Sequence, residues 1–166
     1  MTRVGFCGLG VMGYPMAGHL ASEGYSVSVY YRSSARADAW VAEHFGTAFV
    51  TPREVAANSD IVMLCVGNDA DVRAVVMGPD GVLAGAHSGL IVVDHTTTSA
   101  ELARETGLSV TPCATLDAAL EGVDIAITCT PSREPLIESR HLHPGLHITA
   151  MGSDAENKNE ICPQAL

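Results

Sequence analysis

Three glycines near the start of the chain have the spacing of a loop that binds phosphate. They follow the apolar run 3–7 and precede a capped, amphipathic helix pattern that Gly24 ends. The loop consists of Gly8, Leu9, Gly10, Val11, Met12 and Gly13. The first glycine would allow a tight turn, the second a close approach of pyrophosphate, and the third close packing of helix on strand. Free N–H groups and the helix dipole at this point favour a dinucleotide site over a merely structural turn.

The residues after the second apolar run indicate which dinucleotide would bind. That run ends in Tyr31, Arg32 and Ser33, and no carboxylate follows before Asp38. A site that prefers NAD usually ends this strand in Asp or Glu, which hydrogen-bonds the ribose hydroxyls and repels a 2′-phosphate. A guanidinium fork beside a hydroxyl suits a phosphate, so NADP(H) is favoured over NAD(H). The alternative is that Arg32 packs on the adenine or is solvated.

Short apolar runs alternate with helix-like patterns along the whole chain. The runs cover residues 3–7, 26–31, 47–50, 60–66, 90–94, 108–110, 124–130 and 147–151. Strands this apolar, separated by helices, are typical of a parallel sheet covered on both faces. We therefore expect an α/β fold with a Rossmann-type, doubly wound and mainly parallel sheet of about eight strands. Residues 1–166 are expected to form a single domain.

Local signals mark several helix ends. Thr51, with Pro52 and a glutamate behind it, predicts a capping box, and Ser99 predicts the start of a helix over 100–105 that Gly107 ends. The stretch 50–66, a capped helix followed by a strand, is echoed by 110–130. Either one helix–strand unit occurs twice, or the echo reflects the general likeness of such units.

Composition excludes several classes of partner. The formal net charge is −10, and the nine Lys and Arg residues form no cluster, so neither nucleic acid nor an anionic membrane is expected to bind. No apolar run approaches the roughly 18 residues of a membrane span, and no leader is recognisable, which predicts a cytoplasmic protein. The five cysteines form no C-x-x-C pair and are expected to be reduced core thiols.

Other polar residues are weaker candidates for chemistry. His141, His143 and His147 have no Cys or carboxylate at ligand spacing beside them, so no metal site is expected. His95 follows the run 90–94 and would lie near a bound nicotinamide, but a base there also needs a substrate in reach. Asp154 is expected to be a solvated loop carboxylate. No catalytic residue is assigned.

The first part of the chain resembles the N-terminal domain of the beta-hydroxyacid dehydrogenases, the family of 3-hydroxyisobutyrate dehydrogenase. The resemblance covers residues 1–107 and rests on GFCGLGVMGYPMAGHL, YRSS, CVGNDADV and VDHTTTSAEL. It implies an NADP-binding domain. The residues that it implies as cofactor contacts are the loop Gly8 to Gly13, Arg32, Ser33, Val66, Gly67, Asn68 and Thr96.

The remainder resembles a different family. Residues 108–162 are similar to the end of the Rossmann domain of the ornithine cyclodeaminase and mu-crystallin family, through T-x-T-P-S and G-x-H-I-x-x-x-G-x-D-x-x-x-K-x-E. The D-A-P-V-S-G-G segment of the first family is replaced by residues 108–114. Two dehydrogenase families in one chain, with no low-complexity linker between 1–107 and 108–166, indicate an engineered or recombined chimera.

The two resemblances also bear on catalysis. Beta-hydroxyacid dehydrogenases use a lysine on a separate all-helical domain, whereas the only lysine here is Lys158, in the second stretch. Asp154 matches an aspartate that the second family uses as acid/base. We therefore expect an oxidoreductase-type cofactor domain without efficient catalysis, and enzymatic activity is left open. The alternatives are an NADPH-dependent reductase of small aldehydes or 2-oxo acids that works as an oligomer such as a homodimer, and a structural chimera with little cofactor affinity.

Overall fold

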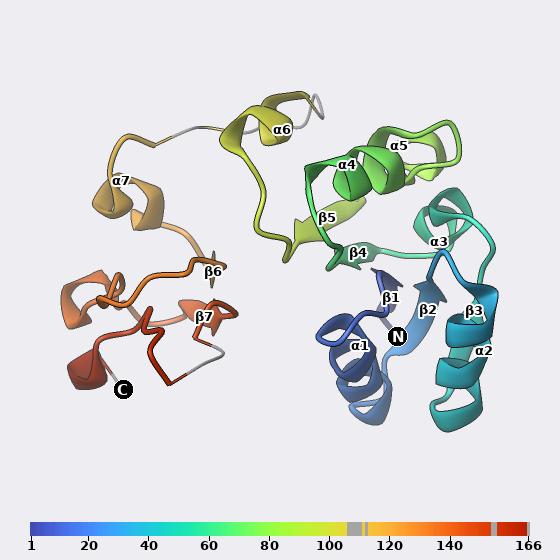
Figure 1. Cartoon of the computed structure of the whole chain (residues 1–166), viewed down its shortest axis with the longest axis horizontal. Coiled ribbons are helices and arrows are strands. Elements are labelled where there is room, and N and C mark those ends of the chain that lie inside the picture. Colours follow the sequence, from blue (N-terminus) through green and yellow to red (C-terminus); the bar gives the residue numbers. More distant parts are fainter. Residues whose placement is uncertain (106–110, 112, 154–155, 166) are drawn as a thin grey trace. The chain divides into compact units, whose positions relative to one another are not determined.

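The chain forms two compact units. The computed structural model describes residues 1–105, 111, 113–153 and 156–165 (Figure 1). One unit covers Met1–Gly107 and the other Leu108–Leu166. The expected strand 108–110 and the expected helix stop at Gly107 lie outside the described residues. Each unit is described here by itself.

The first unit is built on a parallel sheet of five strands. The strands are β1 (Arg3–Cys7), β2 (Ser26–Tyr30), β3 (Gly46–Ala48), β4 (Ile61–Leu64) and β5 (Ile91–Asp94). Their order is β3-β2-β1-β4-β5, which Figure 1 shows with β1 at the centre. Cys7 pairs with Tyr30 of β2 and with Leu64 of β4, so these three strands end at the same level. The loops that follow them therefore start side by side.

Helices cover both faces of this sheet. They are α1 (Gly13–Ser22), α2 (Ser34–Glu43), α3 (Pro52–Ala57), α4 (Asp69–Val72), the π-helical turn η1 (Arg73–Met77), α5 (Val82–Gly85) and α6 (Ala100–Glu105). Phe6 of β1 packs with Trp40 of α2 in one buried cluster. The next residue, Cys7, packs with Val55 of α3 in a second cluster. Because neighbouring strand residues point to opposite faces, the sheet is doubly wound, as predicted.

Most of the predicted helix ends agree with the structure. Thr51 and Glu54 form both bonds of the capping box, and the Ser99 hydroxyl accepts from Leu102 N at 3.2 Å, as predicted. Gly24, at φ 85°, ends α1 as expected. The prediction of a capped start for α1 is wrong, because its N-cap residue Met12 has no side-chain oxygen and makes no side-chain capping bond.

The second unit has a smaller parallel sheet. Its elements are α7 (Leu116–Leu120), β6 (Ile125–Thr128), the 3₁₀ turn η2 (Ser139–His141), β7 (His147–Ala150) and the 3₁₀ turn η3 (Pro163–Ala165). Strands β6 and β7 pair with each other, and Ile137 is buried between the unit's apolar side chains. The helix of the echoed stretch begins at Leu116 and is capped by Thr115, later than the echo implied. The α/β class is as predicted, whereas one sheet of about eight strands stays a prediction.

The cysteines are less buried than expected. None of the five described cysteines forms a disulfide, but only Cys7 is buried, while Cys113 is exposed and the others are half-buried. Burial raises the pKa of Cys7 to about 12. A thiol held neutral in this way is unreactive.

None of the helices in the described ranges is long and apolar enough to cross a membrane.

A buried carboxylate that has no cationic partner among the described residues organises the second unit. The side chain of Glu160 is fully buried. Its Oε1 accepts from the amide and the hydroxyl of Thr130, at 2.6 and 2.7 Å, and its Oε2 accepts from Thr128 Oγ1 at 2.8 Å and Gly152 N at 2.7 Å. Burial alone would raise the pKa of Glu160, but these bonds together lower it below its ordinary value.

We predict that Glu160→Gln destabilises the second unit by about 1–3 kcal/mol, because an amide NH₂ would face donors and leave them unsatisfied. Native-state hydrogen exchange of the β6 and β7 amides measures this loss. The fluorescence of Trp40, the single tryptophan, reports on the first unit and should not change. The exposed Glu134→Gln is the matched control and should leave exchange unchanged.

The same residue gives the second unit a defined pH dependence. Because the folded-state pKa of Glu160 lies below the ordinary 4.5, its stabilisation is fully present above that pH and is lost as the pH falls through the lower folded-state pKa. The Gln variant should lack this acid-dependent loss. Parallel acid profiles for the two proteins would contradict the assignment.

Candidate functional site

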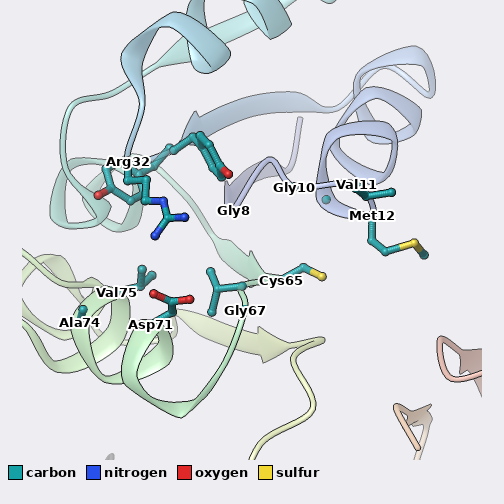
Figure 2. Close-up of a pocket in the computed structure, with 14 residues that line it drawn as sticks. Gly8, Gly10, Val11, Met12, Arg32, Cys65, Gly67, Asp71, Ala74 and Val75 are labelled. Atoms are coloured by element: carbon teal, nitrogen blue, oxygen red, sulfur yellow. The ribbon is translucent and has the colours of Figure 1, made fainter. Parts of the chain in front are cut away.

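A cavity opens at the carboxyl ends of β1, β2 and β4. It has a volume of about 420 Å³ and is drawn in Figure 2. Its lining residues are Gly8, Gly10, Val11, Met12, Gly13, Tyr30, Tyr31, Arg32, Cys65, Val66, Gly67, Asp71, Ala74 and Val75. Strand β1 pairs with β2 on one side and with β4 on the other, so the strand order changes direction at β1. Such a switch point is where ligands of open α/β sheets bind.

The three glycines of the loop differ in what they allow. Gly8 has φ 106°, which disfavours any side chain, and a Cβ there would strike the carbonyl of Cys65. A Cβ on Gly13 would strike the carbonyl of Gly8, so α1 starts in direct backbone contact with the loop. A Cβ on Gly10 would meet no protein atom within 4 Å. Gly10 therefore borders open space, which fits a position that a ligand approaches.

The loop leaves donors for an anion. Among the described residues, the amides of Gly10, Val11 and Met12 have no protein acceptor. The guanidinium of Arg36 donates to the carbonyls of Leu9 and Gly10 and lies over the ring of Tyr14 at 4.9 Å. Arg36 thereby holds the loop carbonyls on the side of α2. The Leu9 side chain is buried in the core and does not line the cavity.

The end of β2 supplies the cation of the cavity. Tyr31 and Arg32 line it, and Arg32 is exposed, with no hydrogen bond or ion pair to any residue that the structure describes. Ser33 is the N-cap residue of α2, and its hydroxyl makes no capping bond. Ser33 does not line the cavity but stands next to Arg32. A guanidinium and a hydroxyl are thus both available at this end.

The loop after β4 forms the opposite wall. Val66 and Gly67 line the cavity. Asn68 instead caps α4, where its Oδ1 accepts from Asp71 N at 3.1 Å. The Thr96 hydroxyl accepts from Val66 N at 3.0 Å and is buried. Asn68 and Thr96 are therefore placed to hold the loop, and neither lines the cavity.

Five lining residues were not predicted from the sequence. Tyr30 and Cys65 are the neighbours of predicted positions, whereas Asp71, Ala74 and Val75 come from α4 and η1. The spacing of the last three, one turn of helix directly after the loop 66–68, is a signal that could have identified them. Burial raises the pKa of Cys65 and of Tyr30, which keeps both groups neutral.

Arg32 and Asp71 are the charged side chains of this cavity. They face each other across it in Figure 2. The remaining lining is backbone, aromatic or apolar. The arrangement can bind an elongated ligand that has an anionic centre near the glycine loop, a further anion near Arg32 and an apolar part.

The other candidates lie away from this cavity. His95 is buried at the end of β5, and burial lowers its pKa, but it does not line the cavity. His141 is held by Asp117, with 2.8 Å between Nε2 and Oδ1, and by the amide of Glu138. In the described ranges, no three His, Cys, Asp or Glu side chains gather at metal-ligand distances. Asp154 lies outside the described residues.

Two family profiles match the chain over overlapping stretches. Residues 3–124 match the NAD binding domain of 6-phosphogluconate dehydrogenase. Residues 92–166 match the ornithine cyclodeaminase/mu-crystallin family. The overlap, residues 92–124, surrounds the predicted junction at 107.

Individual relatives agree with the first match. An uncharacterised oxidoreductase of Shewanella frigidimarina is 50% identical over 124 residues, which are 74% of this chain and 43% of that protein. A solved 3-hydroxyisobutyrate dehydrogenase of Mycobacterium tuberculosis has a TM-score of 0.57 at 30% identity, covering 64% of this chain and 35% of its own. Psf3, solved in complex with NADP+ and 2-OPP, has a TM-score of 0.57 at 29% identity, covering 61% and 36%. This chain thus spans less than half the length of these proteins.

We predict different stability effects for two glycine substitutions in the loop. Gly13→Ala should destabilise the first unit by about 1–3 kcal/mol through overpacking, which outweighs the helix-propensity gain of at most about 1 kcal/mol. Gly10→Ala should leave stability unchanged, because its Cβ meets open space. Urea unfolding followed by Trp40 fluorescence measures both. Equal stabilities of the two variants would contradict the proposed packing of α1.

Proposed function

We propose that this chain, which belongs to the family of the NAD binding domain of 6-phosphogluconate dehydrogenase, binds NADP(H) in preference to NAD(H) in the cavity at the carboxyl ends of β1, β2 and β4. The pyrophosphate would accept hydrogen bonds from the amides of Gly10, Val11 and Met12. The 2′-phosphate would bind Arg32, with the hydroxyl of Ser33 beside it. Tyr31, Val66 and Gly67 would contact the adenosine half.

One observation carries the preference for NADP(H). Arg32 reaches into the cavity at the end of β2 without a protein partner among the described residues, where an NAD site usually has a carboxylate. A guanidinium binds a phosphate dianion with two parallel, charge-assisted bonds. The net charge of −10 gives no general attraction for a phosphate, so local donors must supply it. The neighbour solved with NADP+ supports the same preference.

We further propose that the chain joins parts of two dehydrogenase families, as an engineered or recombined chimera. The two family matches support this proposal, because each covers one part of the chain and they overlap near residue 107. The division into compact units at Gly107 supports it as well. The two family matches overlap because both families contain helix–strand units of the same kind. A cytoplasmic location and a homodimer remain predictions from the sequence.

We also propose that these 166 residues do not catalyse efficiently by themselves. The cavity holds no lysine, and the single lysine, Lys158, belongs to the second unit. Burial raises the pKa of Cys65 and of Tyr30, which makes both weaker proton donors. Loss of a positioned general acid typically costs about 10²–10⁴-fold in rate. The second candidate function is an NADPH-dependent reductase of small aldehydes or 2-oxo acids, favoured by the likeness to 3-hydroxyisobutyrate dehydrogenase.

We predict that Arg32→Ala weakens NADPH binding by about 10- to 100-fold, because charge-assisted bonds worth about 1.5–3 kcal/mol are lost. NADH binding should change much less, since NADH has no 2′-phosphate. Titration of the fluorescence of each reduced cofactor measures both affinities. The exposed Arg133→Ala, in the second unit, is the matched control. Equal losses for the two cofactors would refute the assignment of Arg32 to the 2′-phosphate.

An assay of NADPH turnover distinguishes the two candidate functions. With saturating NADPH and either glyoxylate or succinic semialdehyde, we expect binding but no steady loss of absorbance from the reduced cofactor. Oxidation at an ordinary enzymatic rate, about 1–10³ per second, would instead establish the reductase. The absence of saturable NADPH binding would leave the structural chimera as the remaining interpretation.

A further inference from the structure

The end of the cavity where the adenine base would bind carries the carboxylate of Asp71, to which the proposed function assigns no role. If NADP(H) binds as proposed, the pyrophosphate lies on the glycine loop and the 2′-phosphate lies on Arg32. The base then extends beyond the ribose, into the part of the cavity that α4, η1 and the loop after β4 enclose. Val66, Ala74 and Val75 line this part with apolar surface. Such a surface suits the face of a purine ring.

The carboxylate of Asp71 is fixed at the edge of this apolar surface. Its Oδ2 accepts from Asn68 Nδ2 at 3.2 Å, while Asn68 Oδ1 accepts from the Asp71 amide. The same oxygen lies 2.7 Å from where a Cβ on Gly67 would stand, so the carboxylate packs against the bare backbone of the loop. Within the described part of the chain, no donor contacts Oδ1 of Asp71. One oxygen is therefore held by the protein, and the other is left for a ligand.

A carboxylate in this place selects for hydrogen-bond donors. An ionised carboxylate only accepts hydrogen bonds. The 6-amino group is the donor of the adenine ring, whereas hypoxanthine has a carbonyl oxygen there, which a carboxylate would repel. We propose that Asp71 recognises the 6-amino group of the adenine and so makes the site selective for 6-amino over 6-oxo purine dinucleotides. This inference rests on the proposed function, because it needs the dinucleotide in this cavity.

Asp71 has a competing role, which is to attract Arg32 across the cavity. The two side chains face each other, but they form no ion pair within 4.0 Å among the described residues. An effect through Arg32 would change the preference for NADPH over NADH. An effect on the base would change the preference for NADPH over its hypoxanthine analogue, which carries the same phosphates. The two ratios therefore report on different roles.

The experiment compares NADPH with nicotinamide hypoxanthine dinucleotide phosphate, by titration of the whole chain. Both probes fluoresce through the same reduced nicotinamide. We expect the unchanged protein to bind NADPH about tenfold more tightly, the effect of one charge-assisted hydrogen bond. In Asp71→Asn the ratio should fall towards one, because an amide can donate to the 6-oxo group. Asp71→Glu, which keeps the charge but moves it, should also lower the ratio.

Controls separate this inference from a loss of fold and from the proposed function. Asp38→Asn removes an exposed charge of α2 outside the cavity and should keep the full ratio. Trp40 fluorescence shows whether each variant is folded. Equal binding of the two probes by the unchanged protein, or an unchanged ratio in a folded Asp71→Asn, would overturn the role of Asp71 and leave the NADP(H) site standing. Failure of the unchanged protein to bind NADPH would overturn both.

Discussion

The backbone contact between Gly13 and the carbonyl of Gly8 fixes how the first helix sits on the sheet. Because a Cβ on Gly13 would strike that carbonyl, α1 can start immediately above the end of β1 only if residue 13 is glycine. The turn between them depends in turn on the φ of 106° at Gly8. This close approach places the free amides of Gly10, Val11 and Met12 at the cavity. Without it, the free donors of the loop would not converge on one point.

The register of the sheet places the other walls of the cavity next to the glycine loop. Since β1, β2 and β4 end level, the glycine loop, Arg32 and the loop after β4 border a single cavity. Two contacts keep the walls in place. Arg36 ties the glycine loop to α2, and Thr96 ties the loop after β4 to the end of β5. Neither side chain lines the cavity, yet each holds backbone that does.

The sequence predicted the parts of this site that depend on local pattern. The glycine spacing, the capping box at Thr51 and the apolar strands could all be recognised, because each depends on neighbouring residues. Contacts made across the fold could not be recognised in this way. The contacts of Leu9 and Thr96 with the cofactor stay predictions, and the structure shows the Leu9 side chain in the core and the Thr96 hydroxyl accepting from Val66 N. Arg36 was missed because its contact with the glycine loop joins segments distant in sequence. Asp71 was missed although it lies in α4, directly after the loop 66–68.

The two units use the ends of their parallel strands in opposite ways. In the first unit, the amides of Gly10, Val11 and Met12 beyond β1 have no protein acceptor among the described residues, and Arg32 has no carboxylate partner among them. In the second, four donors at the ends of β6 and β7, from Thr128, Thr130 and Gly152, are directed at the two oxygens of Glu160. A carboxylate of the chain itself thus satisfies these donors. Satisfied donors stabilise a fold, whereas unsatisfied ones are available to a ligand. This difference supports phosphate binding in the first unit rather than at the strand ends of the second.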